Sequence, residues 1–575
     1  MTPYFRSIPL LLVLLCAAFS PAQSSKHEVR AVWISSAGGD WPTSTDPAEQ
    51  QRSLLAIFNT LQEQHFNTVF FQVRPRGNVL YRSALEPWAS QLTGVLGRDP
   101  GYDPLEFAIA EAHKRGLELH AWFNVAKVWG SDNLPAHQQH VTRRHREWVR
   151  LFEGEWWLDM GEPDARAYTE ALVKELVSSY DIDGIHFDYI RYPSPSFEDW
   201  GSFTKWGDGV ERPEWRRNNI TAFVRNVYAF VQKEKPWVKV GSAPLGIYQS
   251  IPGAQSSFNG YSGVFQDSRR WLREGIHDYL TPQLYWTIGE QKNPNDPDFY
   301  QLSSDWVNEN AQRHIYIGIG AYRDAVQEEV KEQVRLTREE GAQGQAFFRY
   351  ENVAAVIEQN GPLYTAPALV PPMAWKDSIP PNAPKEITVT KEKGTAVITW
   401  KEPDAAQDRE PVHRYVVYRS MQKKIDTRRA ENIAAVVPAP QRLYRDESSD
   451  GREYFYTVMS LDRAGNESGA PVTTVSELQR ILTRYERPRR AVTVWNTVPA
   501  PMTGRSYIMF DLPARMPVRL SLSGPSAGTP TMLVNDTRTA GLHVVAVDLA
   551  AFPAGAIEYR LSAGDSTIVR TIVKP

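Results

Sequence analysis

The segment DGIHFDYIRYP, residues 183–193, carries groups that can do acid–base chemistry on an apolar frame. It holds two acids, a histidine, an arginine and two tyrosines within eleven residues, more polar groups than a buried strand normally carries. Asp188 ends the apolar run, just before a loop that Pro193 opens. A carboxylate at such a position can act as a general acid, a general base or a nucleophile.

Strand parity predicts which side chains accompany Asp188, because successive side chains of a strand alternate faces. In this segment Ile185 and Phe187 form the apolar parity. His186 and Asp188 therefore point to the opposite face of the strand, which is the inner face if the strands form the closed barrel predicted below. One parity of the eighth strand holds Glu351, which makes it a second candidate catalytic acid. The other strand ends and their rims give the predicted substrate-binding set, which is Gln72, Arg74, Trp122, Asn124, His186, Tyr189, Arg191, Gln283, Tyr285 and Trp286.

The same residues also have purely structural interpretations. Asp188 could be the buried ion-pair partner of an arginine, and Glu351 that of Arg349. The deeper histidines, His120 and His186, are more often hydrogen-bonded core residues than chemical groups. The aromatic side chains could pack in the core or form a platform for a sugar ring.

The elements that must position these groups follow a regular pattern from Arg30 to about Asn352. Helix-like segments such as residues 47–64 alternate with eight short apolar runs: RAVWISS, NTVFFQVRP, LELHAWFNV, DGIHFDYIR, VKVGSAPLG, DYLTPQLYW, HIYIGIGAY and GQAFFRYENV. This alternation predicts an α/β fold, a (β/α)8 TIM barrel over residues 28–370. Barrel enzymes place their sites at the C-terminal strand ends, where the polar residues gather here.

The pattern changes after two proline pairs, Pro371-Pro372 and Pro380-Pro381. Residues 382–476 and 491–575 alternate apolar and polar positions without a helical segment, which predicts two all-β sandwich modules. Proline-rich boundaries between domains usually have few contacts across them. We therefore expect a chain that ends near residue 372 to fold by itself.

Composition and the N-terminus limit partners and location. The chain has 575 residues with 64 basic and 67 acidic side chains, so nothing indicates nucleic acid as a partner. Residues 1–22 are typical of a secretory signal, since about 12 apolar residues cannot cross about 30 Å of hydrocarbon. We expect a secreted, periplasmic or cell-surface protein without a transmembrane span.

The single cysteine, Cys16, lies inside this apolar stretch. A lipidation site would have a small residue before the cysteine, and Leu15 stands there instead, so a lipid anchor is not expected. The mature chain would then have no thiol nucleophile, no disulfide and no cysteine-ligated zinc. We expect no metal and no cofactor.

Five motifs in order, EVRAVWISS, NTVFFQVRP, LHAWFNV, DGIHFDYIRYP and PQLYW, resemble the glycosyl hydrolase-like 10 family of secreted bacterial barrels over about residues 28–365. The resemblance implies hydrolysis of glycan chains, including the glycan of cell-wall peptidoglycan. Val125 replaces a proline common in the family, and Tyr189 stands where other members carry a second acid. The pocket positions that the resemblance implies are Gln72, Arg74, Asn124, His186, Asp188, Arg191, Gln283 and Tyr285.

The β-modules resemble known domains as well. Residues 382–476, with RYVVYRS and YFYTVMSLDRAGNES, resemble a fibronectin type III module. Residues 491–575 resemble the C-terminal β-domain of proteins exported by type IX secretion. This resemblance implies sorting or anchoring at the cell envelope.

The leading hypothesis is a secreted glycoside hydrolase that acts on a cell-envelope or extracellular polysaccharide, with peptidoglycan glycan strands as one candidate. Glycosidic cleavage needs two carboxylates that flank the bond. Asp188 fills one role. A nearby arginine, Arg74 or Arg191, would keep it ionised, as suits a nucleophile or base.

The second carboxylate is less clear from the sequence. Glu351 has the right parity, and Asp267 and Asp324 are loop candidates. Alternatively, an acetamido group of the substrate could replace a protein nucleophile, with Asn124 or Tyr285 orienting it.

Two other hypotheses stay open. A non-catalytic glycan-binding protein on a barrel scaffold would keep the aromatic residues and tolerate loss of Asp188, because fold alone does not imply activity. A metal-dependent hydrolase would use His120, His186 and Asp188 as ligands, although their positions along the strands place them at different depths.

Overall fold

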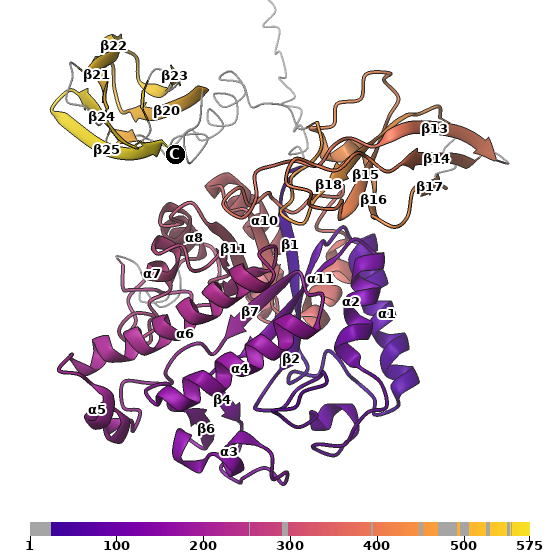
Figure 1. Cartoon of the computed structure of the whole chain (residues 1–575), viewed down its shortest axis with the longest axis vertical. Helices are drawn as coiled ribbons and strands as arrows, with labels where there is room; N and C mark the ends of the chain where they lie inside the picture. The colour runs from indigo at the N-terminus through magenta and orange to yellow at the C-terminus, as the bar shows by residue number, and fades with distance from the viewer. Residues whose placement is uncertain are drawn as a thin grey trace, which may run out of the picture.

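The computed structural model describes residues 25–574, except 252–253, 290–296, 393–394, 448–451, 470–491, 495–504, 525–529, 549–551 and 554. The predicted secretory signal, residues 1–22, lies outside the described residues. Figure 1 shows the barrel followed by a first and a second β-module. Among the described residues, no helix combines the length and apolar character needed to cross a membrane.

A closed parallel barrel confirms the predicted (β/α)8 fold. β12 pairs with β1 and so closes the sheet. The sixth position is split into two short pieces around Pro282, because proline cannot donate to a strand ladder. The strands are β1 (Val29–Ile34), β2 (Thr68–Arg74), β3 (Glu118–Asn124), β7 (Gly184–Asp188), β8 (Lys239–Ser242), β9 (Tyr279–Leu280) with β10 (Gln283–Leu284), β11 (His314–Ile319) and β12 (Gly344–Phe347).

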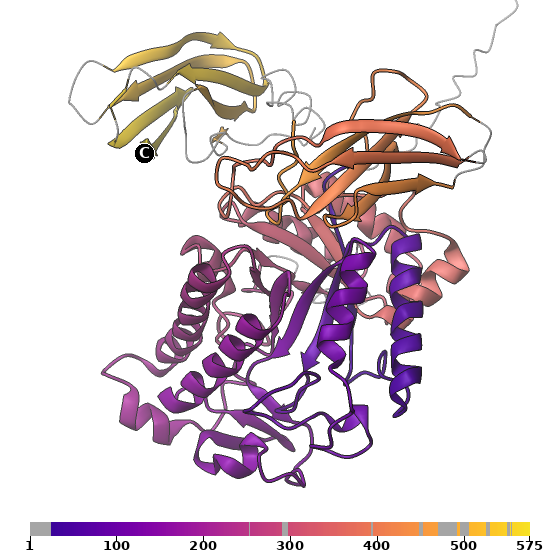
Figure 2. The ribbon, with the colours of Figure 1, turned by 45° about the vertical axis from the view of Figure 1, so that its right-hand side comes forward.

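Helices cover the outside of the barrel (Figures 1 and 2). Asp46 and Asp103 cap the first two through hydrogen bonds to backbone N–H groups, and a proline follows each cap, as in many helix starts. The helices are α1 (Pro47–Glu63), α2 (Pro104–Lys114), α3 (Val141–Arg144), α4 (Pro163–Ser179), α5 (Trp200–Trp206), α6 (Arg212–Glu234), α7 (Ser268–Arg273), α8 (Phe299–Asn308), α9 (Asp324–Gln327), α10 (Val330–Glu340) and α11 (Tyr350–Asn360).

A small antiparallel sheet is inserted between β3 and α4, and no pattern in the sequence predicted it. It consists of β4 (Lys127–Trp129), β5 (Val149–Phe152) and β6 (Glu155–Leu158), in the order β4-β6-β5. Because β4 follows directly on the end of β3, this sheet stands at the C-terminal end of the barrel. It therefore supplies side chains to the rim there.

Strand parity holds through most of the barrel. Outward side chains such as Val69, Ile185 and Phe187 join the large core beneath the helices. Inward side chains form a second cluster around the axis, which includes Trp33, Phe70, Trp122, Tyr279 and Tyr316. Aromatic rings thus fill the interior where barrels commonly use branched aliphatic layers.

The first β-module is built from two antiparallel sheets, as the alternating pattern predicted. Their orders are β13-β14-β17 and β16-β15-β18. Both sheets contribute to one core, in which Ile398 and Trp400 meet Tyr415 and Val417. The strands are β13 (Lys385–Glu392), β14 (Thr395–Lys401), β15 (Arg414–Ser420), β16 (Ile433–Pro438), β17 (Leu443–Asp446) and β18 (Phe455–Leu461), with a 3-10 turn at Ala430–Asn432.

This module packs against the N-terminal end of the barrel (Figure 2), so the expectation of few contacts across the proline-rich boundary is wrong. Arg414 donates to the carbonyl oxygens of Gly116 and Leu117 at 3.0 and 3.1 Å. Arg463 pairs with Asp181 at 2.9 Å. Both contacts involve barrel residues that come just before a strand begins.

The connecting segment, residues 366–377, crosses the same end of the barrel. Met373 is fully buried within it. The Trp375 indole donates to Asp278 at 2.8 Å, and the Lys376 ammonium pairs with the same carboxylate at 3.0 Å. A chain that ended near residue 372 would lose all three side chains.

The second β-module has its own core, which includes Ile508, Phe510, Leu520 and Ile557. It again contains two sheets, with the orders β19-β20-β23 and β22-β21-β24-β25. The strands are β19 (Thr493–Val494), β20 (Arg505–Leu512), β21 (Met516–Ser523), β22 (Thr531–Arg538), β23 (Gly541–Asp548), β24 (Gly555–Ala563) and β25 (Ser566–Lys574).

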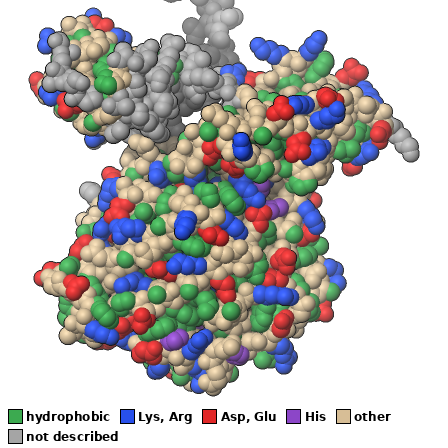
Figure 3. Space-filling view, viewed as in Figure 1, with side chains coloured by type: hydrophobic (Ala, Val, Ile, Leu, Met, Phe, Trp, Pro, Cys, Tyr) green, Lys and Arg blue, Asp and Glu red, His purple; other side chains and the backbone are tan. Residues whose placement is uncertain are grey.

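The molecular surface carries charges of both signs. Figure 3 shows acidic and basic side chains interspersed over the visible face, which agrees with the formal net charge of −3. No single-sign field dominates this face, so a polyanion would find no continuous basic surface on it.

Candidate active site

A cavity of about 340 Å³ opens at the C-terminal ends of the strands. Its described lining comes from the ends of β1, β2, β3, β7 and β10 and from the loops that follow the strands. Of the twelve residues predicted from the sequence, eight line it: Gln72, Trp122, Asn124, Asp188, Tyr189, Arg191, Gln283 and Tyr285.

Asp188 is the last residue of β7 and is partly exposed to the cavity. Its Oδ1 accepts the N–H of Tyr189 at 2.7 Å, and Tyr189 has a φ of +50° that turns the chain onto the rim. Burial raises the pKa of Asp188. The Tyr189 amide and the Arg191 charge offset that rise only in part. Burial therefore works against the ionised form that the nearby arginines led us to expect, which is the direction that a proton donor requires.

Asp188 is the only carboxylate among the described residues that line the cavity, and three cations surround it. Lys127 is paired with Glu155 at 2.6 Å. The Arg191 guanidinium lies 5.4, 5.2 and 5.6 Å from the ring centres of Trp157, Tyr189 and Phe258. The third cation is Arg76.

Arg191 has capacity left for a ligand. It donates to the Tyr192 carbonyl oxygen at 3.3 Å, and no described carboxylate lies within ion-pair distance of it. Burial lowers the pKa of Arg191, and the charges of Tyr189, Asp188 and Glu155 offset this only in part. An anionic group of a ligand would restore that interaction.

Three amides at the cavity also have unused hydrogen-bonding groups. Asn124 donates to the Pro75 carbonyl oxygen at 2.7 Å, while its buried Oδ1 has no described partner. Gln72 uses its Oε1 to accept from Ala37 N–H at 2.8 Å. Gln283 donates to the Ala243 carbonyl oxygen at 3.1 Å. Buried polar groups are normally satisfied by protein, water or ligand, so the Asn124 oxygen is available to an N–H or O–H donor in the cavity.

Aromatic side chains form one wall of the cavity. Tyr285 stacks on Phe348 with ring centres 5.6 Å apart, and Tyr322 meets Tyr285 edge-on at 5.6 Å. Trp122 stands nearby, and its indole favours the charged form of Asp188 without making a hydrogen bond of normal geometry. Such flat, partly polar surfaces suit a sugar ring.

Arg74 does not face the cavity, and the predicted orientation is wrong because of a β-bulge. The register with β3 shifts between Gln72 and Arg74, so one extra residue follows Gln72 and Arg74 pairs with the outward-facing Phe123. Its guanidinium lies over the Phe123 ring and binds Glu86, with Nε–Oε2 at 2.7 Å. Arg74 is a fully buried structural ion-pair residue.

His186 lies beneath the cavity and does not line it. The Trp33 indole donates to His186 Nε2 at 3.0 Å, so the His186 proton is on Nδ1 and points to the Tyr279 hydroxyl at 3.1 Å. That hydroxyl can then donate to His120 Nδ1 at 2.7 Å. Burial holds the pKa of His186 well below its usual value. Both histidines are hydrogen-bonded to Tyr279 beneath the cavity and do not line it, so they are not placed to bind a metal there with Asp188.

Trp286 and Glu351 also lie outside the cavity lining. Trp286 packs against the outer core. β12 ends at Phe347, so Glu351 falls in the first turn of α11, where it is exposed and pairs with Arg349 at 2.7 Å. The assumption that the eighth strand reaches residue 351 is wrong, and strand parity does not apply to Glu351.

The loop candidates for a second acid are placed elsewhere as well. Asp267 accepts the Tyr248 hydroxyl at 2.6 Å, and Asp324 begins α9; neither lines the cavity. Sequence reasoning missed Arg76, in the loop after β2, and Lys127, the first residue of the short strand β4, which the sequence pattern did not predict. Their position just after NTVFFQVRP and LHAWFNV was the available sign.

The fold is a (β/α)8 barrel, and its cavity lies at the C-terminal face, where barrel enzymes have their sites. The family model for glycosyl hydrolase-like 10 matches residues 28–335. Glycosyl hydrolase YngK of Bacillus subtilis (strain 168) is 33% identical over 490 residues, which cover 79% of this chain and 95% of that protein. The chain belongs to the glycosyl hydrolase-like 10 family.

A second relative matches a smaller share of the chain. Glycosyl hydrolase DigH of Escherichia coli (strain K12) is 31% identical over 333 residues, or 52% of this chain and 75% of that protein. Among solved structures, the catalytic domain of a beta-amylase from Paenibacillus polymyxa gives a TM-score of 0.40 at 12% identity, covering 58% of this chain and 98% of that one. That distant likeness adds nothing to the family assignment.

Proposed function

We propose that the chain is a glycoside hydrolase and that Asp188 is its proton donor. The observation that carries this proposal is Asp188, at the end of the fourth barrel strand, the single carboxylate among the described residues of the cavity, whose pKa burial raises. A proton donor near neutral pH needs such a raised pKa. The aromatic wall and the unused amide groups beside it suit a saccharide.

The absence of a second carboxylate from the described cavity lining supports a substrate-assisted reaction. We propose that the acetamido group of an N-acetylated sugar takes the role of the nucleophile, as in some glycosidase families. The free Oδ1 of Asn124 would accept the acetamido N–H. Burial keeps the Tyr285 pKa well above its usual value, so its hydroxyl stays a donor.

The proposed reaction proceeds in two displacements. The Asp188 carboxyl gives its proton to the glycosidic oxygen as the bond from that oxygen to the anomeric carbon breaks. The acetamido oxygen bonds to the anomeric carbon and forms an oxazolinium ring. Water then attacks the same carbon, opens the ring and returns a proton to Asp188, so the anomeric configuration is retained.

The cations at the cavity support an anionic glycan as the substrate. Arg191 lacks an ion-pair partner among the described residues, and Arg76 and Lys127 stand on the same rim. Peptide-free peptidoglycan strands carry both features, an acetamido group and a free carboxylate on the muramic acid residue. We propose these strands as the substrate class.

A panel of three glycans tests the proposal, with products read by mass spectrometry. Peptide-free peptidoglycan strands combine the acetamido group and the carboxylate, chitin oligomers have only the acetamido group, and cello-oligomers have neither. We expect fast, slow and no cleavage, respectively. Cleavage of cello-oligomers would contradict the acetamido mechanism. Binding of glycans without cleavage of any would favour the non-catalytic alternative.

Export and envelope association belong to the same proposal. The composition of residues 1–22 supports a cleaved secretory signal. The two β-modules, with their resemblance to fibronectin type III and sorting domains, would hold the barrel at the envelope. N-terminal sequencing of the mature protein should begin at Gln23, and a mature protein that still begins at residue 1 would contradict export by this signal.

A further inference from the structure

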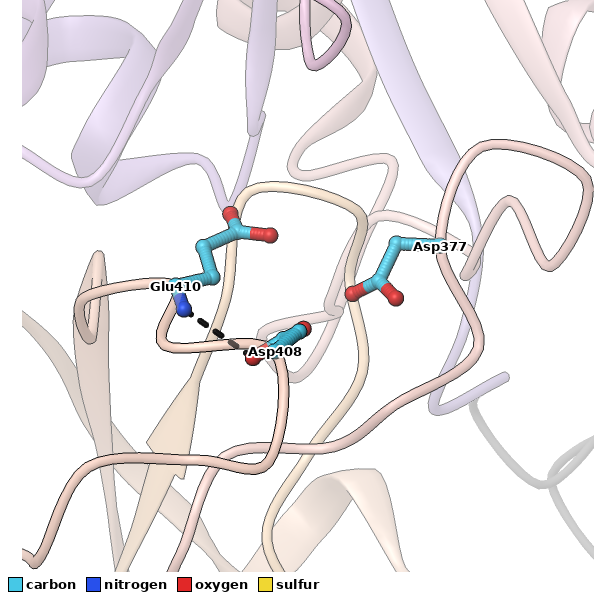
Figure 4. Close-up of side chains that lie close together, drawn as sticks. All are labelled: Asp377, Asp408 and Glu410. Atoms are coloured by element: carbon cyan, nitrogen blue, oxygen red, sulfur yellow. Dashed lines mark hydrogen bonds between the residues drawn. The ribbon is translucent and has the colours of Figure 1, made fainter.

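Three carboxylates converge where the connecting segment meets the first β-module (Figure 4). Asp377 comes from the connecting segment, and Asp408 and Glu410 come from the loop between β14 and β15. One oxygen of each lies within 4.8 Å of the others. No described lysine, arginine or histidine forms an ion pair with any of the three.

Backbone and amide donors fix the direction of these groups. Ile379 N–H donates to Asp377 Oδ1 at 2.9 Å, and Glu410 N–H donates to Asp408 Oδ1 at 3.0 Å. Asp408 and Glu410 each keep one oxygen for another partner, whereas Asp377 Oδ2 accepts the Asn466 amide at 3.3 Å. The arrangement therefore holds concentrated negative charge in a defined geometry.

A fourth carboxylate, Asp462, gives independent evidence for a ligand. It is 3% exposed, and its Oδ1 accepts the N–H of Asn466 at 2.8 Å. Its Oδ2 is buried and has no described partner. The amide of Asn466 also donates to Asp377 Oδ2 at 3.3 Å, which ties the two acids together.

No described basic side chain forms an ion pair with Asp462, although this carboxylate is buried. A buried acid without a cation partner is unfavourable, and a bound cation would remove the penalty.

We propose that Asp377, Asp408 and Glu410 bind one calcium ion, and that this ion also supplies the counter-charge that the buried Asp462 carboxylate lacks. Calcium takes about six to eight oxygen ligands, often including several carboxylates, at about 2.3–2.6 Å, and three oxygens within 4.8 Å of one another can reach one such ion. Magnesium usually keeps several of its waters and takes only one or two carboxylates. Zinc prefers nitrogen and sulfur ligands, and the group contains no histidine or cysteine.

The ion would connect three segments that are far apart in the sequence. These are the connecting segment, the loop that carries Asp408 and Glu410, and the loop from Asp462 to Asn466. It would therefore strengthen the attachment of the first β-module to the barrel, because a ligand that binds only the folded state stabilises it by mass action. This role is independent of the chemistry proposed at Asp188.

The test uses the full-length protein, freed of metal with a chelator and then titrated with calcium chloride. Isothermal titration calorimetry should show saturable binding of one ion, and the melting temperature should rise by several degrees. Magnesium chloride should bind at least tenfold more weakly. Absent or non-saturable calcium binding, or equal magnesium affinity, would overturn the proposal.

Variants locate the site. Asp408→Asn combined with Glu410→Gln should weaken calcium binding at least tenfold, yet melt in chelator at or above the wild-type temperature, because like-charge repulsion is removed. The control Asp404→Asn changes an exposed acid of the same loop that pairs with Lys385, and it should bind calcium normally. Unchanged binding in the double variant, or loss in the control, would place the ion elsewhere.

Discussion

The N-terminal end of the barrel pairs its buried charges, whereas the C-terminal end leaves several of them unpaired. At the N-terminal end, Lys239 donates to both carboxylate oxygens of Glu118 at 2.6 Å. At the other end, Arg191 has no ion-pair partner among the described residues, and Asn124 Oδ1 accepts no described hydrogen bond. Buried polar side chains are thus paired at one end of the barrel and lack described partners at the other.

The difference separates stability from function. The first β-module and the connecting segment cover the N-terminal end, and the buried charges there form ion pairs with one another. The C-terminal end opens to the cavity, where Arg191 and Asn124 keep groups without a described partner. In (β/α)8 barrels the loops at the C-terminal end can vary with the chemistry, because the opposite end contributes mainly to stability. Changes at the two ends should therefore produce different losses.

The largest expected effect is on folding, when the connecting segment and the first β-module that cover the N-terminal end are removed. A chain ending at residue 372 lacks Trp375 and Lys376, which leaves the carboxylate of Asp278 buried without its ammonium partner. We expect it to be insoluble or unfolded by circular dichroism. A chain ending at residue 469 keeps the module and should fold normally. A well-folded shorter chain with the full melting temperature would show that the cover is dispensable.

The next effect concerns the buried pair at the covered end. Lys239→Met removes the ammonium and leaves Glu118 buried and unpaired, which should cost about 3–5 kcal/mol of unfolding free energy. Urea denaturation measures this loss. Turnover of the remaining folded protein should be unchanged, because the pair lies at the opposite end from the cavity. A loss of turnover without loss of stability would break the division between the ends.

A smaller effect is expected at the open end, in substrate preference. Arg191→Gln should lower kcat/KM for peptide-free peptidoglycan strands by about 10- to 100-fold, in line with the roughly 1.5–3 kcal/mol of a hydrogen bond to a charged group. Chitin oligomers lack the carboxylate and should be affected little. Equal losses on both substrates would show that Arg191 does not recognise the anionic group.

The smallest effect is a shift of the pH profile. Asp188 must be protonated to act, so turnover should fall as pH rises through its raised pKa, by at most about tenfold per unit. Arg191 favours the charged form, so Arg191→Gln should raise the pKa of Asp188 further and move the descending limb to higher pH. A limb that stays in place or moves to lower pH would mean that another group is titrating.

Periodicity explains why the barrel and much of its pocket could be predicted from the sequence. Alternation along β3 and β7 placed Asn124 and Asp188 toward the axis, because nothing interrupts the register between these strands. Arg74 was misplaced because a bulge of one residue reverses the parity after it. Glu351 was misplaced because its strand ends earlier and a helix begins.

Other features depend on tertiary contacts that a linear pattern does not contain. The alternating pattern showed that residues 382–476 form strands, but not that Arg414 and Arg463 reach barrel residues. The raised pKa of Asp188 follows from burial in the folded cavity, whereas the nearby arginines in the sequence favoured an ionised group. The sequence also carried no sign that Asp377 and Asp408 would meet.

The division between the two ends is tested most directly by one paired measurement on β7, which has Asp188 at its end and Asp183 just before its start. Asp183 accepts from His113 and from Leu119 N–H, each at 2.8 Å, in the covered end. The test compares turnover and melting temperature of the Asp188→Asn and Asp183→Asn variants. Asp188→Asn should lose about 10²- to 10⁴-fold in kcat with an unchanged melting temperature. Asp183→Asn should melt lower and keep its turnover. A well-folded Asp188→Asn protein with near-normal turnover would contradict the account.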